Sequence, residues 1–151
     1  MKERDYLKLA IQKAEDSSRK GLFPAGALVV KADRVVSSTV SAVFPDYKHS
    51  ESKAVDEAFE KLGKSLKGCT LYCSLEPCLM CLTRAYWAGI RRVVYACRRN
   101  AVSQYYFEGI NHIGSIIQSF NEKLELVYYQ NLEKSSLSVV RTWEQGRVVG
   151  M

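Results

Sequence analysis

The chain has 151 residues, of which 47% are hydrophobic and 25% are charged, a composition typical of one globular domain covering residues 1–151. It has no repeat, no low-complexity tract and no apolar run near the ~20 residues needed to cross a bilayer, which argues against fibrous, disordered and membrane-spanning classes. The start, MKERDYLKLA, lacks the apolar segment of a signal peptide, so we expect a cytoplasmic protein. The net charge of +6 would assist contact with phosphates without demonstrating it.

Helical and strand periodicities alternate along the chain. In chain order they predict a helix over 4–20, strands over 25–30 and 34–40, a helix over 49–62, a strand over 69–75, a helix over 78–88, a strand over 92–97, a helix over 108–120 and a strand over 124–130. Gly21, Gly63 and Gly89 follow the first three helices, as expected of residues that end helices.

This order of elements indicates a three-layer α/β/α sandwich with a five-stranded mixed sheet. The first two strands are joined by a short turn and should form an antiparallel hairpin, and we expect the remaining strands to pair in parallel. The tail from Ser135 is ambiguous, although Leu137, Val140 and Trp143 could line one side of a final helix.

Five cysteines in a reducing compartment favour metal binding, catalysis or burial over a disulfide framework. Cys78 and Cys81 open the helix that follows Pro77, so both sulfurs can face the same side. Taken alone, this C-x-x-C pair fits a metal site and a redox site nearly equally. Cys69, Cys73 and Cys97 are interpreted as packing residues, although a four-cysteine structural zinc site that includes Cys69 and Cys73 is conceivable.

The motif KHSES, at the start of the second helix, decides between these alternatives. His49, Cys78 and Cys81 make three ligands of the kind that zinc prefers and leave the fourth tetrahedral position for water, as in a catalytic site. Glu51 would lie beside that water as a proton acceptor and donor, rather than bind the metal. The prediction is a Zn²⁺-dependent hydrolytic deaminase, with Glu51 as the catalytic residue.

Four arginines flank the strand at 92–97. Arg91 and Arg92 precede VVYAC, and Arg98 and Arg99 follow it. They could be solvated residues at the strand ends, which we favour, or contacts to an anion or to RNA.

The order H-x-E followed by P-C-x-x-C, here His49 to Cys81, is a signature of zinc deaminases. The chain resembles the cytidine deaminase superfamily, in the branch of guanine deaminases, tRNA adenosine deaminases and fungal-type cytosine deaminases. FPAGALVV, KHSES and TLYCSLEPCLMC carry the resemblance, which runs from about residue 5 to residue 130. It implies zinc on the three predicted ligands, proton transfer by Glu51, a backbone N–H near Cys78 that steadies the substrate, and a homodimer.

Substrate contacts are predicted more broadly. Aromatic side chains stack on heterocycles, and AYWAGI and YYFEG resemble guanine deaminases. The candidate substrate-binding residues are Phe23, Pro24, Ala25, Ser50, Glu76, Trp87, Phe107 and Glu108.

Three departures from the relatives bear on the substrate. Gly109 stands where guanine deaminases have a second acidic residue, and RRNAVSQ lacks the Lys-Thr-Gly-rich loop of tRNA deaminases. SSTVSAVFPDYK lacks the asparagine that many relatives place before the histidine motif, so Ser38 or Ser41 could replace it. The leading hypothesis is deamination of a free nucleobase or related heterocycle, guanine-type before cytosine. The alternatives are a tRNA adenosine-to-inosine deaminase, with RNA as partner, and a non-enzymatic zinc protein.

Overall fold

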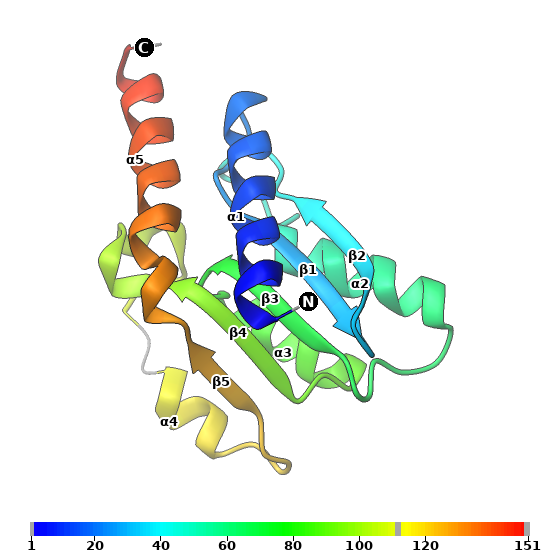
Figure 1. Ribbon diagram of the computed structural model, residues 1–151. Helices are drawn as coiled ribbons and strands as arrows, with labels where there is room; N and C mark the ends of the chain where they lie inside the picture. The colour runs from blue at the N-terminus through cyan, green and yellow to red at the C-terminus, as the bar shows by residue number, and fades with distance from the viewer. Residues whose placement is uncertain (1, 111–112, 150–151) are drawn as a thin grey trace.

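The computed structural model describes residues 2–110 and 113–149 (Figure 1). The elements in chain order, with η for 3-10 helices, are α1 (Glu3–Arg19), β1 (Gly26–Lys31), β2 (Arg34–Val40), α2 (Ser50–Leu62), β3 (Thr70–Leu75), α3 (Leu79–Ala88), β4 (Arg92–Cys97), η1 (Arg99–Ala101), η2 (Gln104–Tyr106), α4 (Ile113–Gln118), β5 (Glu125–Tyr128), η3 (Gln130–Leu132) and α5 (Glu133–Val149). Within these ranges, no helix combines the length and apolar character needed to cross a membrane.

The five strands form one mixed sheet in the order β2-β1-β3-β4-β5. β3, β4 and β5 pair in parallel, but β1 is antiparallel to both of its neighbours. The expectation that all pairs after the hairpin are parallel is therefore wrong for β1 with β3. Because α2 carries the chain from β2 across to β3, these two strands run in the same direction on either side of β1, which must oppose both.

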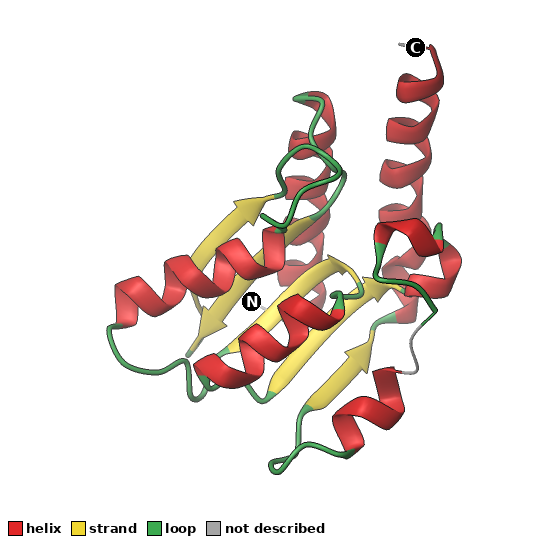
Figure 2. Ribbon diagram, turned by 180° about the vertical axis from the view of Figure 1, so that it is seen from behind, coloured by secondary structure: helices red, strands yellow, loops and turns green. Residues whose placement is uncertain are grey.

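Helices cover both faces of the sheet and complete the predicted three-layer sandwich (Figures 1 and 2). α1 and α5 pack on one face, where Leu7, Ala10 and Val139 join the apolar side chains of the central strands. α2, α3 and α4 pack on the other face around Leu71, Leu82 and related residues. Both faces of the central strands are thus buried, which explains why β1, β3 and β4 are almost continuously apolar.

The contact between α1 and β1 is unusually close. A Cβ atom on Gly26 would lie 2.4 Å from the Ala10 carbonyl oxygen and 2.5 Å from the Lys13 Cβ atom. Only glycine fits there without a shift of the helix. The close approach brings the loop after α1, with Phe23, to the end of the sheet where β3 and β4 finish.

The C-terminal third of the chain differs most from the sequence prediction. The helix expected over 108–120 is shorter, since α4 covers Ile113–Gln118, residues 108–110 are not helical, and residues 111–112 lie outside the described ranges. Gly109 has φ +126°, a conformation that does not belong to a helix. The ambiguous tail forms α5, which begins at Glu133 and extends past the end of the sheet beside α1 (Figure 1).

The arginines around β4 form ion pairs with acidic side chains. Arg99, with 12% of its side chain exposed, differs from the solvated residue expected at a strand end. The pairs are Arg91 with Glu122, Arg92 with Glu3 and Glu125, Arg98 with Glu133, and Arg99 with Glu76. Their carboxylate partners lie up to 89 positions away in sequence, which spacing alone does not reveal. Much of the local positive charge is thereby compensated.

The three cysteines interpreted as packing residues are confirmed as buried. Cys69 and Cys73 belong to the core under α2 and α3, and Cys97 belongs to a small cluster near α5. Burial raises the pKa of all three thiols. These thiols are therefore held in the neutral form that suits a core residue.

Candidate metal centre and active site

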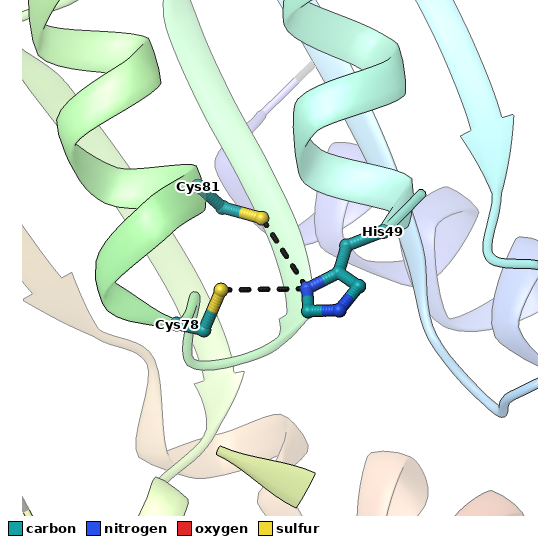
Figure 3. Close-up of side chains that lie close together, drawn as sticks. All are labelled: His49, Cys78 and Cys81. Carbon is teal, nitrogen blue, oxygen red and sulfur yellow. Dashed lines mark hydrogen bonds between the residues drawn. The ribbon is translucent and has the colours of Figure 1, made fainter. Parts of the chain in front are cut away.

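Two helix starts bring the predicted metal ligands together. His49 is the residue before α2, and Cys78 is the residue before α3, with Cys81 in the first turn of α3. Their side chains point toward one another across the gap between the two helices (Figure 3). One ligand atom from each residue lies within 4.8 Å of the other two, so residues 29 and 32 positions apart form one cluster.

The distances within this cluster fit a zinc ion. The His49 Nδ1 atom lies 3.3 Å from the Cys78 sulfur and 3.6 Å from the Cys81 sulfur. Two tetrahedral ligands with ordinary Zn–N and Zn–S bond lengths stand about 3.6 Å apart. The nitrogen and two sulfurs therefore already have the spacing that zinc requires, and the chemistry of the three donors is the one zinc prefers.

Hydrogen bonds to neighbouring groups orient the ligands. The His49 Nε2 atom donates to the Asp46 carbonyl oxygen at 2.7 Å, which orients the ring with Nδ1 toward the sulfurs. The Ser52 hydroxyl donates to the Cys81 sulfur at 3.1 Å. Asp46 and Ser52 were not singled out from the sequence. Both lie within three residues of His49, and this closeness was the one indication that they could contact the metal ligands.

The electrostatics of the cluster favour a thiolate at Cys78. A hydrogen bond from Cys81 and a second from His49 lower the pKa of Cys78 to about 5, against the opposing effect of burial. The hydrogen bond to Cys78 raises the pKa of His49 to about 9. The hydrogen bond to Cys78, followed by burial, raises the pKa of Cys81. Binding of a metal to this site must therefore displace protons.

Glu51 lies beside the three predicted metal ligands but is not part of their cluster. Its side chain is buried, and one carboxylate oxygen lies 3.8 Å from the Cys81 sulfur. Desolvation, followed by the neighbouring Cys78 charge, raises the pKa of Glu51 to about 7. A carboxyl group in this position can hold or release a proton near neutral pH, which is the property of a general acid and base.

The cluster opens into a partly open cavity where β1 begins and β3 ends. His49, Glu51 and Cys78 form part of its lining, and aromatic side chains form another part: Phe23, Phe44, Tyr106 and Phe107. Phe44 and Tyr106 were not singled out from the sequence, although Tyr106 lies within YYFEG. The cavity thus combines a polar reactive end with flat apolar surfaces, as aromatic ligands require.

Four of the eight predicted substrate contacts line this cavity: Phe23, Ala25, Glu76 and Phe107. Ser41, one of the two proposed replacements for the missing asparagine, lines it as well, whereas Ser38 lies outside its lining on β2. The Ser41 oxygen accepts a hydrogen bond from the Ser50 backbone N–H at 3.1 Å. Its own hydroxyl proton is thus available as a donor toward the cavity.

The other four candidates lie outside this lining. Pro24 and Ser50 are fully buried behind it. Trp87 is 85% exposed on α3, because Ala85, two positions earlier, faces the core and Trp87 therefore points to solvent. Glu108 accepts a hydrogen bond from the Leu79 backbone N–H at 2.9 Å and so caps the start of α3.

A buried ion pair supports the loop that carries Cys78. Arg99 makes two contacts to the Glu76 carboxylate, through its backbone N–H and its Nε atom, both at 3.0 Å. It also donates to the Pro77 carbonyl oxygen at 3.1 Å. Arg99 therefore ties residues 76–77 to the start of η1, and Glu76 uses both carboxylate oxygens in this pair even though it borders the cavity.

This combination of a His/Cys/Cys centre, a buried glutamate and a sandwich with a five-stranded mixed sheet defines a zinc-dependent deaminase. Residues 1–97 match the model of the cytidine and deoxycytidylate deaminase zinc-binding region. The chain belongs to this family, as the sequence motifs indicated.

Relatives of the chain include deaminases of different substrates. It is 30% identical over 138 residues to the tRNA-specific adenosine deaminase of Aquifex aeolicus, covering 87% of this chain and 88% of the relative. It is 30% identical over 148 residues to the guanine deaminase of Bacillus subtilis, covering 95% and 94%. A solved structure from work on tRNA:A34 deaminases superposes with a TM-score of 0.74 at 25% identity, covering 90% of this chain and 99% of that one.

Proposed function

We propose that the protein deaminates a free nucleobase or a related small aminated heterocycle, with a guanine-type ring favoured and cytosine as a further candidate. The observation that carries the proposal is the position of Glu51 and the His/Cys/Cys centre at the polar end of a cavity bordered by aromatic rings. A flat heterocycle can stack between such rings while its amino-bearing carbon faces the reactive groups. The guanine deaminase of Bacillus subtilis, similar over nearly the whole chain, supports the choice of a purine.

The residues of the site suit a hydrolytic exchange. Zinc, when held by His49, Cys78 and Cys81, supplies a Lewis acid that brings the ionisation of water toward neutral pH. Glu51 accepts the proton that the attacking water loses and returns it to the amino group. The carbon gains an oxygen, its bond to nitrogen breaks, and ammonia leaves.

Ammonia release from a panel of compounds tests the proposal. The panel holds guanine, adenine and cytosine, their nucleosides, and aminated triazines and pterins, with Glu51→Ala as the blank. Turnover of a free base by the wild type alone is the expected result. Absence of turnover for every compound, from protein with one zinc per chain, would overturn the proposal.

A tRNA adenosine deaminase is the second candidate. The similarity to the Aquifex aeolicus enzyme and the net charge of +6 favour it. An anticodon stem-loop with adenosine at the wobble position is the substrate to test, because binding to RNA falls steeply with salt whereas uptake of a neutral base does not. Inosine formation that declines between low and high salt would support this candidate over the first.

We also propose that the protein forms a homodimer through the outer surface of α3, where Trp87 is exposed. Trp87 is 85% exposed, and tryptophan is among the residues enriched at protein interfaces. Light scattering of the wild type and of Trp87→Lys is the test. A dimeric wild type with a more readily dissociated variant is expected, and a monomeric wild type would contradict the proposal.

A further inference from the structure

Four aromatic rings from distant parts of the chain pack against one another beside the cavity. They are Phe23 after α1, Phe44 between β2 and α2, Tyr106 in η2 and Trp143 in α5. All six pairs among these four residues are in contact, with ring centroids 5.2 to 6.3 Å apart. Such spacings are those of favourable edge-to-face and tilted aromatic pairs, so the four rings form one packed unit, called the aromatic cluster below.

Trp143 has a different position from the other three members of the aromatic cluster. Phe23, Phe44 and Tyr106 line the cavity, whereas Trp143 is 6% exposed and lies outside its lining. It contacts all three of them from the side of α5. Trp143 therefore supports the cavity wall from behind and does not contact a substrate in the cavity.

Two further residues of α5 strengthen this support. The Tyr106 hydroxyl donates to the Glu144 carboxylate, which fixes the ring at its polar end. The Arg147 guanidinium lies 4.6 Å from the centre of the Trp143 ring and 5.9 Å from that of Phe44. Because none of the residues of η2 is buried, these contacts to α5 help to hold Tyr106 in position.

α5 itself is anchored away from the cavity. It packs on α1 and β4, and Glu133 at its first turn accepts hydrogen bonds from the Arg98 backbone N–H, Nε and Nη2 atoms at 2.9 to 3.0 Å. Because interlocked side chains in a packed interior move only at the expense of their neighbours, Phe44 and Tyr106 cannot separate without disturbing Trp143 and α5.

We propose that α5 sets the upper size limit of the substrate through Trp143 and Glu144, which hold Phe44 and Tyr106 as one wall of the cavity. On this proposal, the wall admits a free heterocycle and resists a ring that carries a ribose, which would have to displace Tyr106 or Phe44. The inference rests on the proposed function, since it concerns the same cavity. Trp143 and Glu144 act as positioning residues, because neither one lines the cavity.

Binding measurements test the size limit without turnover. In a Glu51→Gln background, calorimetry gives the Kd of guanine and guanosine, and of cytosine and cytidine, for the parent protein, for Trp143→Leu and for Tyr106→Phe. The first substitution removes the support behind the wall, and the second removes only the hydrogen bond to Glu144. Phe120→Leu, which reduces a partly buried aromatic ring that packs on Tyr86 outside the cavity lining, is the matched control.

The readout is the ratio of the nucleoside Kd to the base Kd. We expect the ratio to fall by about tenfold in Trp143→Leu and by about threefold in Tyr106→Phe, while the base Kd stays nearly constant. Changes of this size are typical when a steric contact that discriminates between two ligands is lost. Phe120→Leu should leave the ratio unchanged. In the Glu51-containing enzymes, the nucleoside KM should fall while kcat for the base stays within about twofold.

Two results would overturn the size limit. The first is a parent protein that binds the nucleoside as well as the base, or that binds neither. The second is a ratio of nucleoside Kd to base Kd that stays the same in both variants when both are folded. Tyr106→Phe keeps the packed ring, so the test survives if Trp143→Leu fails to fold. A clear ratio that responds to the variants, in an enzyme that releases no ammonia from any base, would instead overturn only the proposed function.

Discussion

A Glu51 carboxylate oxygen lies 3.8 Å from the sulfur of Cys81, so the buried carboxyl group adjoins the metal ligands without replacing one of them. Glu51→Gln should keep zinc at one per chain and reduce turnover by about 10²- to 10⁴-fold, because it removes the proton transfer alone. Metal analysis and ammonia release measure the two effects. The exposed Glu60 of the same helix, changed to glutamine, is the control. Loss of zinc from Glu51→Gln would assign Glu51 to the metal shell.

Replacement of a sulfur ligand should act on metal and stability together. Cys81→Ser is expected to lose zinc and to lower the Tm to that of the chelator-treated wild type, because ligand bonds contribute directly to folding. Cys97→Ala, a change at a buried cysteine outside the cluster, should retain zinc. Zinc content and thermal unfolding with and without chelator are the measurements. A chelator response in Cys81→Ser equal to that of the wild type would contradict the assignment.

The Arg99–Glu76 pair gives a prediction about stability. Both side chains are nearly buried, with 12% and 9% exposed, so removing one partner leaves an uncompensated charge. Arg99→Ala should lower the free energy of unfolding by about 3 kcal/mol. Arg84→Ala breaks the exposed pair with Asp56 and should cost below about 1 kcal/mol. Urea unfolding compares the two variants, and equal losses would show that burial of the first pair has no energetic consequence.

Acid should weaken the anchor of α5. Hydrogen bonds from Arg98 lower the pKa of Glu133 from 4.5 to about 2. A carboxyl group with a lowered folded-state pKa contributes stability above its unfolded pKa, and the contribution disappears as the pH falls from about 4.5 to about 2. Glu133→Gln should therefore destabilise the protein at pH 7 and make little difference near pH 2.

Urea unfolding at several pH values measures this effect. Glu57→Gln, in the exposed pair with Lys61 on α2, is the control and should have a small effect throughout. A Glu133→Gln effect that does not change with pH would show that the ionised carboxylate is not the stabilising form.

Ser41 provides a prediction about substrate binding. Its hydroxyl borders the cavity and already accepts the Ser50 N–H, so it can donate one hydrogen bond to a bound base. Ser41→Ala should raise the KM about three- to tenfold, the equivalent of one neutral hydrogen bond, with a smaller change in kcat. Ser38→Ala, three residues earlier on β2 and outside the cavity lining, is the control. Equal KM values for both variants would remove Ser41 from the substrate contacts.

The sequence was sufficient for the chemistry of the centre. His49, Glu51, Cys78 and Cys81 were found because each pair lies within four residues at a helix start, and helical spacing sets the direction of side chains so close in the chain. The alternation of strands and helices gave the sandwich for the same reason: periodicity is a local property. Cys69, Cys73 and Cys97 were also correctly placed in the core.

The tertiary structure decided what depends on contacts between distant segments. The direction of β1 against β3, the burial of Arg99 on Glu76 and the exposure of Trp87 follow from strand order and packing, which no spacing within one segment encodes. The aromatic cluster is the clearest case, since Phe23 and Trp143 meet only after α1 and α5 pack side by side. The sequence by itself thus determined which reaction the site supports, whereas only the packing of α5 placed Trp143 against the aromatic side chains that line the cavity.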